Sequence, residues 1–138
     1  MAGQNMFGTT IRVLDNALDL RAKKMETISA NIANAETPGY SRLRMDFEEA
    51  LREAAAGSAT TQTATHPQHF GSAPGGGAAD VEAHIYRDMQ HTGVGDNNNV
   101  SLEREMVDLA ENQIRYEAAT RMLSKRFNML KMVIRGQA

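Results

Sequence analysis

The apolar residues of this chain recur at helical spacing near both ends and are sparse in the middle. Toward the C-terminus they follow a repeat of four and three positions along one stripe, in which Gln113 and Thr120 are polar and the apolar members are Leu102, Met106, Leu109, Tyr116, Leu123, Phe127, Leu130 and Ile134. The N-terminal stripe has the same spacing and consists of Phe7, Ile11, Leu14, Leu18, Met25, Ile28 and Ile32. A 3.5-residue repeat held over about four heptads predicts a long helix whose narrow apolar stripe another helix must cover.

Two such helices predict a mainly α fold. At 1.5 Å per residue each helix would be about 45–50 Å long, which is too long for a compact domain of this size. We therefore expect a rod-like assembly component in which the two terminal helices pack as an antiparallel coiled-coil hairpin. Polar residues interrupt the stripes at Arg21, Gln113 and Thr120, where they would oppose slippage of one helix along the other.

The first helix is expected to run from residue 6 to about residue 36. Thr37 precedes a proline, which disfavours helical geometry, and Pro38 with Gly39 suits the central positions of a type II turn. The predicted division is a helix over 1–36, an extended middle segment over 37–100 and a second helix over 101–138. Ser101 is the expected N-cap of that second helix.

The middle segment is expected to contain little β structure. Leu43, Met45 and Phe47 occupy alternate positions, which predicts a short extended piece, and one or two helical turns should follow it. Residues 54–80 are rich in Ala, Thr and Gly and contain one charged residue, so they cannot bury enough apolar surface to order by themselves. A second short strand is expected around Ile85 and Tyr86.

Composition narrows the function classes. The 138 residues are 41% hydrophobic and 5% aromatic, which is thin for a sizeable core, and the net charge of -2 gives no general attraction to nucleic acid or anionic membrane. Cysteine is absent, and no run of 18 apolar residues predicts a membrane span. The N-terminus lacks the basic and apolar regions of a secretory signal. We therefore expect a cytoplasmic chain, or one exported without cleavage of a signal peptide.

Candidate chemistry is weak throughout. His66 and His69, with His84 and His91 elsewhere, invite a metal-site hypothesis, but no third ligand of fixed geometry accompanies them. The glycine-rich stretch 71–77 lacks the Gly-Lys-Ser/Thr of a phosphate loop, and no serine has the surroundings of a nucleophile. We expect no catalytic residue, no cofactor and no metal.

The most specific local string covers residues 29–40, Ser-Ala-Asn-Ile-Ala-Asn-Ala-Glu-Thr-Pro-Gly-Tyr. Asn31 and Asn34 are poor mid-helix residues because their amides compete for backbone hydrogen bonds. One interpretation is polar capping at the end of the helix. The other is a pair of amides that bond to the backbone of a packed neighbour and set the register.

This string resembles the signature of the flagellar basal-body rod and hook protein family, with the matching positions Asn31, Asn34, Thr37, Pro38, Gly39 and Tyr40. The short middle segment, with no inserted β-domain, is similar to the small proximal rod members. Three further strings, at 46–51, 65–70 and 95–103, resemble one of those small members in particular. Another small rod member is expected to share the terminal helices but to differ at those strings.

The resemblance implies a structural subunit of the proximal rod that polymerises helically through its terminal helices on the periplasmic side of the basal body. Implied partners are further copies, other rod proteins, the rod-to-MS-ring adaptor, the MS ring and the flagellar type III export gate. Phe7 and Ile11 fit a short apolar gate-recognition pattern, although both are also stripe positions. The rival hypothesis is a coiled-coil export chaperone or adaptor, which has no reason to carry the 29–40 string.

Overall fold

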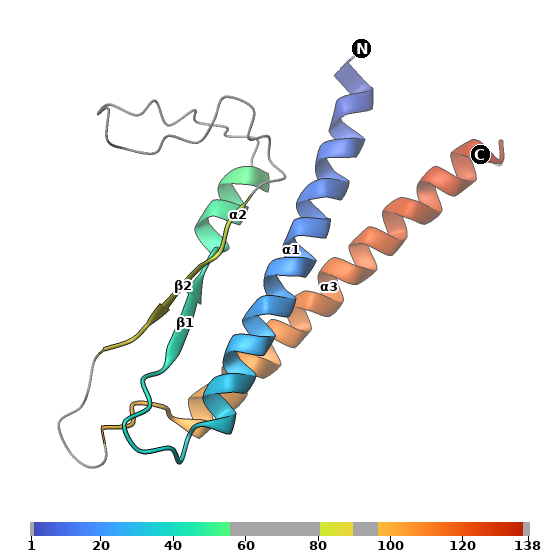
Figure 1. Cartoon of the computed structure of the whole chain (residues 1–138). Helices are drawn as coiled ribbons and strands as arrows, with labels where there is room; N and C mark the ends of the chain where they lie inside the picture. The colour runs from blue at the N-terminus through green and yellow to red at the C-terminus, as the bar shows by residue number, and fades with distance from the viewer. Residues whose placement is uncertain (1, 56–80, 90–96, 137–138) are drawn as a thin grey trace, which may run out of the picture.

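The computed structural model describes residues 2–55, 81–89 and 97–136. Within these ranges, the side chains of residues 2–7 and of Thr9 are not described. Its elements are α1 (Ala2–Ala33), β1 (Leu43–Asp46), α2 (Glu48–Ala55), β2 (His84–Arg87) and α3 (Leu102–Ile134). The two long helices run antiparallel, lie against each other at the end where the chain turns and diverge toward the termini (Figure 1). The predicted mainly α fold with a terminal-helix hairpin is confirmed. The predicted loop 54–80, with His66 and His69, lies almost wholly outside the described residues, as does His91.

Helix α1 ends three residues earlier than the sequence predicted. Its last residue is Ala33, and residues 34–36 form a turn. The expected type II turn follows: the Tyr40 N–H donates to the Thr37 carbonyl at 3.2 Å, and Gly39 has a φ of +73°. That positive φ is the reason for glycine at this position, because a side chain disfavours it.

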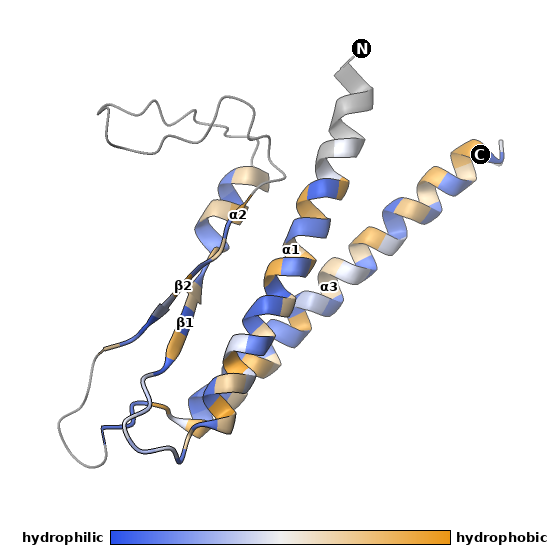
Figure 2. Ribbon diagram, viewed as in Figure 1, coloured by the Kyte–Doolittle hydropathy of each residue, from blue (hydrophilic) through white to orange (hydrophobic). Residues whose placement is uncertain are grey.

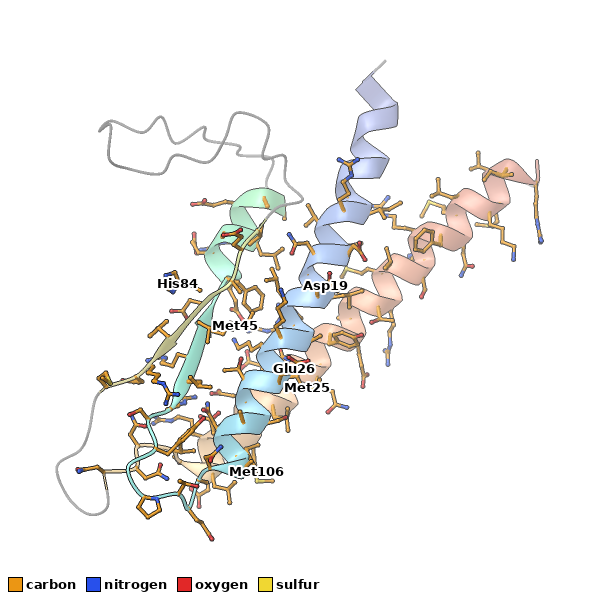
Figure 3. The ribbon with its side chains drawn as sticks, in the orientation of Figure 1. Asp19, Met25, Glu26, Met45, His84 and Met106 are labelled. Carbon is orange, nitrogen blue, oxygen red and sulfur yellow. The ribbon has the colours of Figure 1, made fainter. Side chains whose placement is uncertain are left out.

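The middle segment forms a short antiparallel ribbon against α1. β1 pairs with β2, with Leu43 opposite Arg87 and Asp46 opposite His84. The alternation predicted from the sequence is present: Met45 and the residue after β1, Phe47, are buried with Leu20 of α1 in one small core. His84 is exposed on the outer side of the ribbon (Figure 3). The ribbon therefore lies against one side of α1 and α3 against another.

The face that α3 buries against the rest of the molecule differs from the predicted stripe. Its buried residues are Glu105, Asn112 and Ala119, seven positions apart. Each lies one position before a residue of the predicted stripe, namely Met106, Gln113 and Thr120, all of which are exposed. Four other stripe residues are half-buried as expected: Leu109, Tyr116, Leu123 and Leu130. The helix is thus rotated relative to the prediction, because two polar side chains find partners in the interior.

That rotation, together with the divergence of the two helices toward the termini, exposes apolar residues which the sequence had placed in the hairpin. Leu102 is 48% exposed, Phe127 53% and Ile134 84%. On α1 the predicted stripe holds better, since Ile28 is buried and its other described members are half-buried, namely Ile11, Leu14, Leu18, Met25 and Ile32. Figure 2 shows apolar positions recurring along α3 to its last turn.

Candidate assembly site

Asn31 joins α1, β1 and α3 at the closed end of the hairpin. Its side chain is 1% exposed, and its amide nitrogen donates to the Leu43 carbonyl at 2.8 Å and to a Glu105 carboxylate oxygen at 3.0 Å. Its amide oxygen accepts the Leu43 N–H at 2.8 Å and the Tyr40 hydroxyl at 3.3 Å. The amide therefore bonds Leu43 as a neighbouring strand would, which fixes where β1 meets α1.

Glu105 is the most deeply buried acidic group of the described residues, with none of its surface exposed. Its carboxylate accepts hydrogen bonds from Asn31 and from the Arg42 guanidinium, which also donates to Asp108 at 2.7 Å. A buried carboxylate is tolerated when a cation and hydrogen bonds replace its water. Arg42 lies immediately before β1, so this ion pair ties the ribbon to α3.

The contacts among Asn31, Leu43, Arg42 and Glu105 form a joint between α1, β1 and α3. Two asparagines before α3 add further hydrogen bonds to this joint. The Asn98 amide nitrogen lies 3.0, 2.8 and 2.9 Å from the carbonyl oxygens of Asn34, Ala35 and Thr37, which follow the end of α1. Carbonyl groups at a helix end lack partners within the helix, and a side-chain amide can supply one. Asn99 accepts the Arg42 N–H at 2.7 Å and donates to the Asp88 carbonyl at 2.7 Å. From the sequence, this asparagine run was noted as part of the string 95–103 that carries the family resemblance.

Asn34 behaves differently from Asn31. Its amide nitrogen donates to the Ala30 carbonyl one turn back at 2.8 Å, and its amide oxygen accepts the Thr37 hydroxyl at 3.3 Å. Both contacts are local, so the capping interpretation is correct for Asn34, whereas the packed-neighbour interpretation is correct for Asn31. Ser101 occupies the expected N-cap position of α3 but makes no side-chain capping bond.

The polar position predicted at Arg21 pairs with Asn112 and not with Gln113 or Thr120. The Asn112 amide donates to the Arg21 carbonyl at 2.9 Å and accepts from its guanidinium at 3.4 Å. Both residues lie in the hairpin interior, and this pair therefore sets the register between α1 and α3. It lies farther along the hairpin toward the chain termini than the Asn31 joint. The Arg21 guanidinium also lies 5.6 Å from the centroid of the Phe47 ring.

A second ion-pair cluster surrounds Glu48 at the start of α2. Its carboxylate lies 3.2 Å from the Lys24 ammonium and 2.7 Å from the Arg115 guanidinium. Partial burial raises the pKa of the Glu48 carboxyl, but Lys24 and Arg115 outweigh that effect and hold the pKa below its ordinary value of 4.5. The cluster links α1, α2 and α3 at the edge of the small core.

The exposed apolar surface of α3 is larger than the sequence indicated. Besides four members of the predicted stripe, it includes residues off that stripe: Val107, Ile114, Met122, Met129, Met132 and Val133. The side chain of Phe7 lies outside those described. In the described part of the chain no group of three potential metal ligands occurs. None of the described helices is long and apolar enough to cross a bilayer.

Two long helices are held together here by buried hydrogen bonds and an ion pair, and apolar side chains are exposed along one of them. This is the architecture of a structural assembly subunit. The family model for the flagella basal body rod protein matches residues 11–40, which include Asn31 and the Gly39 turn. The chain is 37% identical over 131 residues to the flagellar basal body rod protein FlgB of Cereibacter sphaeroides, covering 95% of this chain and 98% of that protein. It is 32% identical to FlgB of Bacillus subtilis, with 96% and 98% covered, and 33% identical to FlgB of Salmonella typhimurium, with 91% and 93% covered.

This chain belongs to the FlgB family of flagellar basal body rod proteins. Similarity over nearly the whole length, and not only in the terminal helices, favours FlgB over the other small rod subunit considered from the sequence, FlgC.

Proposed function

We propose that this chain is a structural, non-enzymatic subunit of the proximal rod, which polymerises helically through its terminal helices to build part of the drive shaft for motility. The observation that carries this proposal is the apolar surface of α3 that the hairpin leaves uncovered, with Met106 59% and Phe127 53% exposed. A soluble monomer rarely leaves so many large apolar side chains exposed on one helix, and neighbouring subunits would cover them.

The separate positions of the long helices and the β-ribbon support this role. The stripe residues of α1 and α3 would form the inner packing layer, while the ribbon would lie outside it. The Asn31 and Glu105 joint would hold the two layers at one angle, since it bonds α1, β1 and α3 together. A rod that transmits rotation needs such a rigid connection.

Family membership also supports the finer assignments. We infer that further copies, other rod proteins, the rod-to-MS-ring adaptor and the MS ring are its contacts, on the periplasmic side. Export would use the flagellar type III gate without cleavage of a signal peptide, and Phe7 with Ile11 would be the recognition residues. An export chaperone is disfavoured because the relatives named above are rod proteins.

The test is complementation of a strain that lacks the chain, followed by purification of basal bodies. We expect motility to return and the chain to be found at the proximal level of the rod. Phe127→Ala should be secreted but should fail to complete rods, whereas Arg52→Ala, which removes an exposed α2 side chain, should behave as wild type. A chain that restores motility but is absent from purified basal bodies would refute the proposal.

A further inference from the structure

Helix α3 has an unequal distribution of charge that its position in the hairpin does not explain. Residues 102–117 contain five acidic and two basic residues, whereas residues 118–138 contain five basic residues and no acidic one. The helix dipole favours this order but acts only within the first and last turns. The boundary between the halves lies in the middle of a 33-residue helix, so the dipole does not account for it.

The basic half has a groove on its outward side. Its volume is about 400 Å³, and its lining includes Met129 and Met132 together with Arg121 and Lys125. In the part of the chain that the structure describes, no carboxylate pairs with Lys125, and Met132 is 52% exposed. Arg121 lies 3.4 Å from Glu117 one turn back, and an exposed pair of this kind is weak enough to exchange partners. The groove is therefore a surface depression in which Met129 and Met132 are the apolar residues and which has a positively charged border.

The acidic half has a complementary ridge. Val107 and Ile114 are 65% and 69% exposed and lie two helical turns apart on the outward side. Glu103 and Glu117 flank them and are exposed. Among the basic residues of this half, Arg115 is already paired with Glu48 and Glu111.

Ridge and groove have the spacing of a repeating contact. Ile114 and Met132 are eighteen positions apart, which is five turns of an α-helix, so both lie on the same side of α3 about 27 Å apart. A second α3, running parallel, displaced by that length and turned to face the first, would place Ile114 against Met132. The same displacement would place Glu103 opposite Arg121 and Glu117 opposite Arg135.

We propose that the groove of one copy binds the Val107 and Ile114 ridge of a second copy of this chain, in a head-to-tail contact between their α3 helices. This inference rests on the proposed role as a polymerising rod subunit and specifies one of its contacts. The contact is heterologous, so a bound pair leaves one ridge unused on one copy and one groove unused on the other, and the array stays open. A free apolar peptide or a closed pair of antiparallel α3 helices are the competing occupants.

Disulfide crosslinking tests the contact, because the chain contains no cysteine. A chain with Ile114→Cys and Met132→Cys, oxidised during rod assembly in a strain lacking its own copy, should give a ladder of dimers, trimers and larger species. The two positions are too far apart within one helix to crosslink to each other. Replacing the ridge cysteine by one at exposed Ala22 of α1 is the matched control and should abolish the ladder.

Two crosslinking results would overturn the proposed contact between α3 helices. Crosslinking that stops at a dimer would favour the closed antiparallel pair and overturn the proposal, as would an absence of crosslinked species from a chain that restores motility. If the wild-type chain itself failed to restore motility, the proposed function would be wrong. The two failures are thus distinguishable.

Charge reversal supplies an independent arm. Arg121→Glu should reduce the crosslinked fraction about tenfold, since it replaces attraction to Glu103 with repulsion, and Glu103→Lys in the same chain should restore it. Arg12→Glu on α1 controls for the change in net charge. Equal crosslinking in the Arg121→Glu chain with and without the Glu103→Lys partner would refute the register.

Discussion

Replacing Asn31 by Ala removes the central hydrogen-bonding group of the joint. The Asn31 amide accepts the Leu43 N–H and donates to the Leu43 carbonyl, both at 2.8 Å, and also donates to Glu105. Truncation leaves two partly buried backbone groups without these partners, and each such group costs about 1–3 kcal/mol. Ala is the better helix former, but by at most about 0.7 kcal/mol. We expect the free energy of unfolding to fall by roughly 2–4 kcal/mol.

Urea unfolding of the full chain, followed by far-ultraviolet helicity, measures this change. Asn34→Ala is the matched control, because the hydrogen bonds of the Asn34 side chain are local, to Ala30 and Thr37. Its unfolding free energy should change by no more than about 0.5 kcal/mol. Asn31→Asp keeps the size of the side chain but places a second carboxylate beside Glu105, so it should destabilise at least as much as Ala.

The result that would refute this reasoning is equality between the two asparagines. If Asn31→Ala and Asn34→Ala unfolded at the same urea concentration, the buried bonds of Asn31 would contribute nothing beyond local capping. Restored stability in Asn31→Asp at low pH, where Asp can donate a proton to the Leu43 carbonyl or to Glu105, would agree with the hydrogen-bond explanation.

Substitutions at Gly39, Phe127 and Glu48 test other parts of the structure. At Gly39, whose φ is +73° and where an added side chain would meet open space, Val should destabilise by about 1–2 kcal/mol and Asn by less, as measured by thermal unfolding. Phe127→Ala should leave the unfolding midpoint of the isolated chain nearly unchanged because the ring is 53% exposed, while the pelleted fraction of assembled rods should fall. The lowered pKa of Glu48 stabilises the fold above pH 4.5, and this contribution is lost as the pH falls through the folded value. Urea midpoints of wild type and Glu48→Gln should therefore differ at pH 7 and converge in acid.

The sequence was sufficient for the period of the helices but not for the rotation of α3. The repeat of 3.5 residues identified Leu109, Tyr116 and Leu123 correctly, since these contribute to the half-buried side of the helix. It placed Met106 inside where the structure buries Glu105. A hydrophobicity pattern cannot detect a carboxylate whose desolvation is offset by Arg42, because that partner is 63 positions away.

The candidate site also contains some features that were predictable from the sequence and others that were not. The turn at Gly39 was predictable because its requirement for positive φ is local. The roles of Asn98 and Asn99 were not, since their acceptors and donors include Asn34 and Arg42, more than fifty positions earlier. The string 95–103 contains both residues and carries a family resemblance, which does not indicate what the side chains bind.

The interior of this hairpin contains polar side chains, although apolar residues of α3 such as Met106 and Phe127 could have packed against α1, and assembly provides the reason. Apolar burial is non-directional, so a seam of apolar residues alone would tolerate sliding by a turn, whereas Asn31, Glu105 and Asn112 bond in one register only. A hairpin that buried all its apolar surface would also have none left for a neighbour. Hydrogen bonds and ion pairs thus determine the geometry of the subunit, and the exposed apolar residues of α3 remain available as the driving force for association.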